Sequence, residues 1–135
     1  MYIIVDNDQK ILLSNLDEKY ENILSVDIRN KKPVYHKIKK IENQDTFGKK
    51  SYEIILKNND KISVPGDVFL FDEMGRHLSP RNIRKNNKIL FYENAIIRYT
   101  EIREIKVIDM LKFNRVVCDN PVIISGVLVD CSRKK

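Results

Sequence analysis

The sequence predicts an all-β domain, with a compact arrangement of many short antiparallel strands and hairpins and at most one or two short helical turns. Short apolar runs rich in Ile, Val, Tyr and Phe alternate with turn-forming Asn, Asp, Gly and Pro at close intervals. No segment shows the apolar spacing of a long amphipathic helix. Because there is no fixed-period repeat, low-complexity tract or linker, we predict one domain over residues 1–135.

The first third of the chain is expected to be strands joined by tight turns, because its apolar runs are short and are bounded by Asn, Asp and Pro. The uneven apolar spacing in Val34–Ile41 also predicts a bulge or bend. In chain order the expected elements are a strand at Ile3–Val5, a strand at Lys10–Leu13, a helical turn at 16–18, a strand at Ile23–Asp27, a long strand at Val34–Ile41 and a loop over 44–50.

The stretch from Tyr52 to Leu90 has the clearest strand and turn alternation. Ser79 is expected to cap a helical turn that begins at Pro80, where the fixed φ of proline suits the first helical position. The expected elements are strands at 51–56, 61–64 and 68–71, turns at 58–60 and 73–75, and a turn at 86–87.

The C-terminal part is expected to be strands only. The final apolar runs flank Asp119–Pro121, which predicts a closing hairpin over Val116–Val129, and residues 131–135 are expected to fray. The expected strands before that hairpin are 88–92, 95–99 and 102–108.

The net charge of +6 and pI near 9.3 permit an anionic partner without requiring one. Basic residues are interspersed with aromatic ones, as in single-strand nucleic-acid binders, although core packing explains the aromatic residues equally well. The alternative for the basic clusters is solvated loops and strand edges. The candidate anion-binding or nucleic-acid-binding residues are Lys37, Lys39, Lys40, Arg81, Arg84 and Lys85.

No motif for a cofactor, a metal or common enzyme chemistry is visible. His36 and His77 are isolated in the sequence, and a surface turn is favoured over a cleft for His77. Cys118 and Cys131 lack metal-site spacing, so we expect free thiols, no metal and no cofactor. No apolar run is long enough to span a bilayer and no signal peptide is evident, so we expect a cytoplasmic protein that does not bind membranes.

Several segments, taken in order and with their spacing, make the chain from about Ile3 to Cys131 resemble the Hint superfamily of inteins and hedgehog autoprocessing domains. Tyr52–Val64 resembles the family pattern tyr-glu-ile-x-leu-x-x-gly-x-x-ile-x-val most closely. The other segments are Glu21–Asp27, Val34–Ile38, Phe69–Ile83, Asn87–Leu90 and Val116–Val129. The resemblance implies a Hint fold and an origin in autoprocessing.

The residues that the family uses for splicing are missing. Met1 stands where the family has a nucleophilic Cys or Ser, and the segment that carries this nucleophile is expected to be truncated. Pro65 and Val68 stand near the positions of the family's buried Thr and His, and neither polarises an amide. The closing strand leads to Asp130–Cys131 in place of the terminal His-Asn, so one residue is missing and the histidine is absent.

The first functional hypothesis is therefore a Hint-like domain that has lost splicing and binds a macromolecular partner, with protein favoured over nucleic acid or a small anionic ligand. A phage-encoded accessory protein would fit the size and the Lys, Asn and Ile bias. The alternatives are residual autoprocessing, with Asp130 and Cys131 as weak catalytic candidates, a basic nucleic-acid-binding domain, and a subunit joined through exposed strands such as Val34–Ile41. We lean against an enzyme, because the splicing residues are absent.

Overall fold

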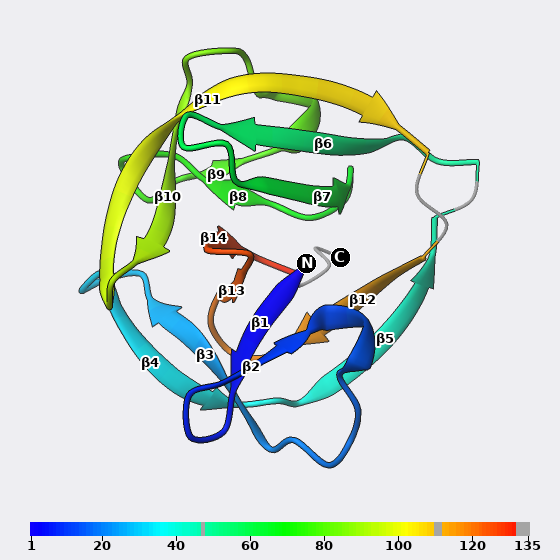
Figure 1. The fold of residues 1–135 in the computed structure, drawn as a ribbon, viewed down its shortest axis with the longest axis vertical. Coiled ribbons are helices and arrows are strands. Elements are labelled where there is room, and N and C mark those ends of the chain that lie inside the picture. Colours follow the sequence, from blue (N-terminus) through cyan, green and yellow to red (C-terminus); the bar gives the residue numbers. More distant parts are fainter. Residues whose placement is uncertain (47, 110–111, 132–135) are drawn as a thin grey trace.

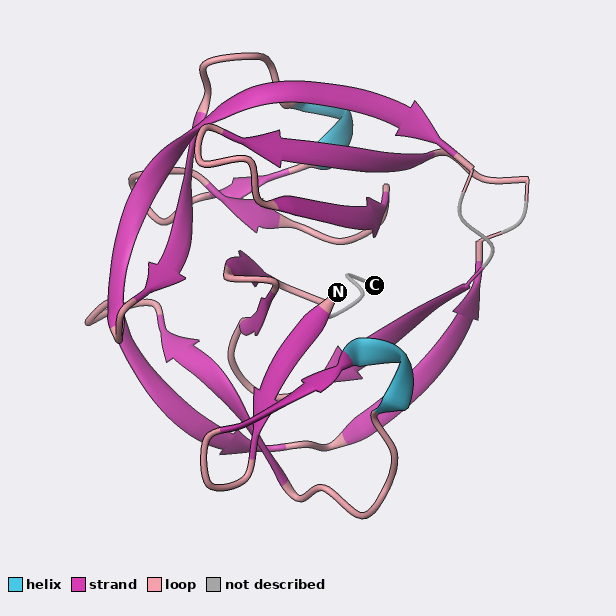
Figure 2. Ribbon diagram, viewed as in Figure 1, coloured by secondary structure: helices cyan, strands magenta, loops and turns pink. Residues whose placement is uncertain are grey.

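The computed structural model describes residues 1–46, 48–109 and 112–131, and within these ranges the protein is all-β (Figure 2). Two single 3₁₀ turns, η1 and η2, accompany the strands. The elements are β1 (Tyr2–Val5), β2 (Gln9–Leu12), η1 (Leu13–Asn15), β3 (Asn22–Asp27), β4 (Lys32–Lys37), β5 (Lys40–Asp45), β6 (Ser51–Leu56), β7 (Lys61–Pro65), β8 (Leu70–Phe71), β9 (His77–Leu78), η2 (Pro80–Asn82), β10 (Lys88–Glu93), β11 (Ile96–Ile108), β12 (Lys112–Val117), β13 (Val122–Ile124) and β14 (Val127–Val129).

The strands form a ring, and β1 and the β13–β14 hairpin lie inside it (Figure 1). The main sheet is antiparallel in the order β2-β1-β3-β13-β14-β10-β11-β6-β7, with β4 added on β3. Two further strand pairs, β12–β5 and β8–β9, complete the structure. The arrangement brings the first strand and the last hairpin together, since the backbone N–H of Ser125 donates to the carbonyl of Tyr2 at 2.8 Å.

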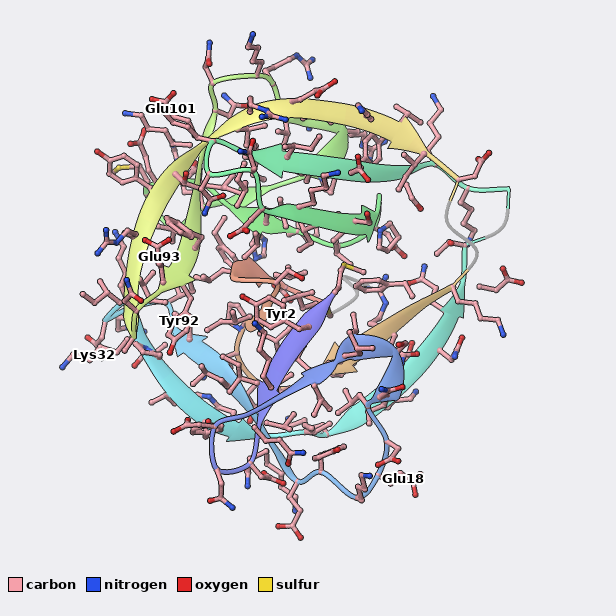
Figure 3. The ribbon with its side chains drawn as sticks, in the orientation of Figure 1. Tyr2, Glu18, Lys32, Tyr92, Glu93 and Glu101 are labelled. Carbon is pink, nitrogen blue, oxygen red and sulfur yellow. The ribbon has the colours of Figure 1, made fainter. Side chains whose placement is uncertain are left out.

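The core fills the inside of this ring. Every residue of β13 and β14 is buried, because the hairpin is covered on both faces, and this explains the continuous apolar run at the end of the sequence. Charged side chains such as Glu18, Lys32 and Glu101 project at the periphery, whereas Tyr2 lies near the centre (Figure 3).

Most expected strands of the first two thirds are confirmed, together with the turns that the Asn and Asp residues predicted. Asn7 and Asp8 adopt φ of 59° and 62° between β1 and β2, and Asn59 has φ of 72° between β6 and β7. The turn at 86–87 is confirmed by Asn86 at φ of 71°. The helical turn at Pro80 is also confirmed, but Ser79 makes no side-chain capping bond to it.

Three expectations in the first third of the chain are wrong. The helical turn is at Leu13–Asn15 and not at 16–18. The long strand expected over Val34–Ile41 is two strands, β4 and β5, because the backbone N–H groups of Ile38 and Lys39 donate to the carbonyls of Glu21 and Val117. The bend predicted within this stretch is confirmed at the same place. The loop expected from residue 44 begins later, since β5 continues to Asp45 against β12.

The C-terminal part differs from expectation in its pairing. The strands expected at 95–99 and 102–108 are one strand, β11, which carries a register shift between Ile102 and Glu104. The closing hairpin is β13–β14 alone, because β12 leaves it to pair with β5. Cys131, expected in a frayed tail, is 3% exposed, and the rest of that tail lies outside the described residues.

We predict that Gly126→Ala destabilises the domain by about 2 kcal/mol. Gly126 turns the β13–β14 hairpin at φ of 83°, and an added Cβ would lie 3.3 Å from the backbone oxygen of Tyr92. The matched control is Gly48→Ala, at φ of 77° with no heavy atom within 4 Å of the added Cβ, for which we expect about 1 kcal/mol from backbone strain alone. Urea unfolding of both variants measures the difference, and equal losses would show that the contact with Tyr92 is harmless.

Candidate functional site at the end of the C-terminal strand

The two candidate catalytic residues from the sequence, Asp130 and Cys131, follow β14 in the middle of the ring. Asp130 forms an antiparallel bridge with Phe69 through two backbone hydrogen bonds, of 2.8 Å from its own N–H and 3.1 Å to its own carbonyl. The backbone on the N-terminal side of the Asp130–Cys131 peptide bond is therefore held by Phe69, the residue that precedes β8.

His77, for which the sequence favoured a surface turn, is part of this site. It lies in β9, and its Nε2 is 2.9 Å from Oδ2 of Asp130. Its ring stacks on Phe69, with 4.7 Å between ring centroids, and tilts against Phe71 at 5.2 Å. His77 is exposed, as expected, but it lies in a strand and not in a turn, because β9 folds back on β8 and brings His77 to the end of the C-terminal strand.

The thiol of Cys131 is protected from chemistry. It is buried, and burial raises its pKa to about 12 from an ordinary value of 9.0. A thiolate is the nucleophilic form, so this cysteine is held in its unreactive form at neutral pH. Cys118 is half-buried, its Sγ donates to the carbonyl of Asn120 at 2.8 Å, and burial raises its pKa as well.

The carbonyl of Cys131 accepts a hydrogen bond of 2.6 Å from Nη1 of Arg115, a residue of β12 that is completely buried. The same guanidinium donates from Nη2 to Oδ1 of Asp67 at 2.6 Å and to Oε1 of Gln44 at 2.7 Å. Gln44 in turn donates from Nε2 to Oδ2 of Asp67 at 3.2 Å. We call Gln44, Asp67, Arg115 and the carbonyl of Cys131 the arginine cluster.

The sequence analysis missed the arginine cluster. Arginine in a strand ordinarily signals a solvent-facing position, because a buried charge requires partners. Those partners come from β5 and from the segment between β7 and β8, both distant in the sequence. No local signal was available, except that the interval from Phe113 to Val117 lacks a clear alternation of polar and apolar residues.

Met1, Pro65 and Val68, which the sequence analysis compared with splicing positions of the Hint family, make structural contacts in this chain. Met1 contributes its carbonyl to the N–H of Leu13 at 2.9 Å, and its Sδ accepts from the N–H of Ser63 at 3.4 Å. Met1 also lines a cavity of about 290 Å³ with Phe113. Pro65 and Val68 are both buried, and neither has a polar side-chain atom.

A second polar network surrounds His36, which also looked isolated in the sequence. Its Nδ1 is 2.5 Å from Oγ of Ser25, and its Nε2 is 2.6 Å from Nδ2 of Asn120. Ser25 is completely buried and donates to the carbonyl of Val34 at 2.9 Å. The Ser25 hydroxyl is therefore out of reach of a substrate, and the network joins β3, β4 and the loop between β12 and β13.

The candidate basic residues fall into two groups. Lys39 pairs with Asp119 at 2.5 Å and Lys40 with Glu42 at 3.0 Å, so the cluster that they form with Lys37 is partly neutralised. Arg81, Arg84 and Lys85 lie in and after η2, where they are exposed. Whether either group binds an anion stays a prediction, as does assembly through β4, which lies at a sheet edge paired with β3.

Within residues 1–46, 48–109 and 112–131 there is no group of three His, Cys, Asp or Glu side chains placed to hold a metal. In the same part of the chain, no helix is both long enough and apolar enough to cross a bilayer.

The all-β ring with the first strand and the last hairpin at its centre is the Hint fold. Three solved inteins share it. The DnaB intein from Synechocystis sp. PCC 6803 has a TM-score of 0.83 and 12% identity, covering 97% of this chain and 94% of that one. The PabCDC21-1 intein has a TM-score of 0.76 and 15% identity, covering 97% and 95%. The transcription factor IIB Mvu mini-intein has a TM-score of 0.72 and 11% identity, covering 96% and 95%.

The expectation of an intein-like Hint fold is thus confirmed. At these identities the likeness concerns the fold, which is shared over nearly the whole chain. No model of a known protein family and no curated protein sequence matches the chain.

Proposed function

We propose that this chain is an intein-fold domain that no longer splices and that acts by binding a partner, with a protein favoured over a nucleic acid. The observation that carries the proposal is the structure around Asp130 and Cys131, which we call the C-terminal junction. There the Cys131 thiol is buried with a pKa of about 12, and the Cys131 carbonyl is bound to a buried arginine. Splicing requires reactive groups and a mobile acyl centre at this point, whereas here the junction is integrated into the core.

The surroundings of the N-terminal splicing step support the same proposal. A splicing domain needs groups that polarise the scissile peptide bond. Pro65 and Val68, which the family resemblance places near those groups, offer only hydrocarbon. If the residues at the splice positions make only structural contacts, the domain acts through binding at its surface. The net charge of +6 favours an acidic partner.

The splicing half of the proposal is tested by placing the chain between two unrelated soluble domains and following the fusion by gel and mass spectrometry. We expect one uncleaved fusion protein and no joined flanking domains. The positive control is an intein that splices, placed between the same two domains and followed in the same way. Joined flanking domains from the unmodified chain would contradict the proposal.

A second candidate function, cleavage after Asp130, is favoured by one contact, the 2.9 Å approach of His77 to the Asp130 carboxylate. In this reaction the carboxylate attacks the carbonyl carbon of its own residue to form a cyclic anhydride. The bond to the nitrogen of Cys131 breaks, protonated His77 supplies the proton to that nitrogen, and water then opens the anhydride. This reaction predicts a species that ends at Asp130, is lost in Asp130→Ala and is slowed in His77→Ala.

The backbone geometry opposes this second candidate. The Asp130 carbonyl accepts from the N–H of Phe69 in a bridge that also holds the Asp130 N–H, so attack on the carbonyl carbon must break strand pairing. The His77–Asp130 contact also fixes the β8–β9 hairpin on the end of the chain, which is a structural role. We therefore place binding ahead of cleavage.

A further inference from the structure

A basic groove lies beside β11, and its lining includes none of the residues at the C-terminal junction. It has a volume of about 610 Å³, and η2 and the loop after it lie beside β11 at this point (Figure 2). Backbone hydrogen bonds of 2.9 Å fix the two sides together, from Asn86 to the Ile102 carbonyl and from Ile102 to the Asn87 carbonyl. Its lining residues are Ile83, Arg84, Lys85, Arg103, Glu104 and Ile105.

The register shift in β11 accounts for one of the cations. Between Ile102 and Glu104 one extra residue is inserted opposite β6, and this residue is Arg103. Ile102 stays buried while Arg103 is exposed. Arg103 was not among the basic residues singled out from the sequence, because the bulge that places it beside Arg84 and Lys85 is a feature of the tertiary pairing.

The groove cations keep their charge available. Nη1 of Arg84 donates to the carbonyls of Ile83 at 3.2 Å and Arg81 at 3.4 Å, and Nη1 of Arg103 donates to Oδ1 of Asn59. These acceptors orient the guanidinium groups without neutralising them. Among the described residues, none of Arg81, Arg84, Lys85 and Arg103 forms a salt bridge, whereas Lys39 and Lys40 do. Glu104, the carboxylate of the groove, lies 3.9 Å from the Lys106 ammonium.

The lining favours a short acidic protein segment over a nucleic acid. Single strands bind through aromatic stacking platforms along a basic track, and the groove lining contains no aromatic residue. The positive charge is also local, since two of the three lysines in the other predicted cluster are paired. Ile105, which is partly buried, provides an aliphatic surface beside the arginines, and Ile83 lies buried beneath it. Arginines are well suited to bind carboxylates through paired N–H donors.

We propose that the Arg84–Lys85–Arg103 groove binds an acidic segment of a partner protein, with carboxylates on the cations and an aliphatic side chain on Ile105. This rests on the proposed binding function and names its surface and the chemistry of its partner. It does not involve the arginine cluster or the C-terminal junction.

The test is fluorescence anisotropy with a short fluorescein-labelled peptide of alternating glutamate and leucine. A labelled oligothymidylate of equal net charge is titrated in parallel. The groove variant carries Lys85→Glu with Arg103→Glu, which spares the Arg84 contacts. The matched control is Lys19→Glu with Lys32→Glu, which makes the same change in net charge at exposed residues elsewhere in the chain. Circular dichroism melting confirms that both variants fold.

We expect the unmodified chain to bind the peptide more tightly than it binds the oligothymidylate. Relative to the unmodified chain, the affinity for the peptide should fall at least tenfold in the groove variant and less than twofold in the control variant. Tighter binding of the oligothymidylate would assign the groove to nucleic acid and overturn the proposal. Equal losses in the two variants, or no binding of the peptide, would also overturn it. Self-cleavage of the chain would contradict the proposal that splicing has been lost. It would not change the conclusion about the groove, which depends only on the binding data.

Discussion

Cys131 is expected to react with iodoacetamide about a thousand-fold more slowly than an ordinary exposed thiol while the chain is folded. Burial raises its pKa from 9.0 to about 12, so at pH 8 the thiolate fraction falls by about three powers of ten. Because the group stays protonated up to about pH 12, its rate should rise about tenfold per pH unit through pH 8–10. An ordinary thiol would begin to level off near pH 9.

Peptide mapping after timed alkylation distinguishes the two cysteines. Cys118, which is half-buried with a raised pKa, should label slowly but ahead of Cys131. In guanidinium chloride the two should label at similar rates, which controls for local sequence effects. Labelling of Cys131 at the rate of Cys118 in the native state would show that the junction opens, contrary to the packing around it.

Asp67→Ala is expected to lower the free energy of unfolding by about 2–3 kcal/mol. It removes the carboxylate that faces the guanidinium of Arg115, which is completely buried and would keep its charge without a counterion. Breaking a buried pair in this way ordinarily costs about 3–5 kcal/mol. We expect less because the Asp67 side chain is half exposed, and because Gln44 and the Cys131 carbonyl still accept from the guanidinium.

The double variant Asp67→Ala with Arg115→Met shows how much of the lost free energy of unfolding comes from breaking the ion pair and how much from leaving the buried Arg115 charge without a counterion. If the uncompensated charge is the main cost, the double variant should be more stable than Asp67→Ala alone. Glu18→Ala, at an exposed loop residue, serves as the surface control and should change stability by less than about 0.5 kcal/mol. A loss in Asp67→Ala no larger than in Glu18→Ala would mean that Arg115 is satisfied without Asp67.

The sequence was informative about local structure and about the fold. Apolar runs bounded by Asn, Asp, Gly and Pro located most strands. Asn, Asp and Gly adopt left-handed backbone that other residues resist, as Asn59 and Asn86 do, and Pro fixes its own φ and lacks an N–H for strand pairing. The order of the segments was sufficient for the Hint resemblance. Which strands pair with each other was harder to predict from the sequence. The apolar residues of β12, for example, are as compatible with pairing in the closing hairpin as with pairing to β5.

The candidate site was only half visible. Asp130 and Cys131 were found because they are adjacent in the chain and follow the last strand. His77 and Arg115 were not placed beside them, because a histidine after a turn and an arginine in a strand are common at surfaces. What brings all four together is the ring closure, in which β8–β9 and β12 approach the end of β14, and this depends on contacts between distant parts of the chain.

The central claim is that the C-terminal junction is a structural element and no longer a reactive one. Its most direct test is the intact mass of the purified chain of residues 1–135, measured fresh and after several days at neutral pH with and without dithiothreitol. We predict one species under all conditions, with the mass of residues 1–135 apart from possible removal of Met1. A second species that ends at Asp130 or Cys131, and that increases with time or with thiol, would contradict the claim.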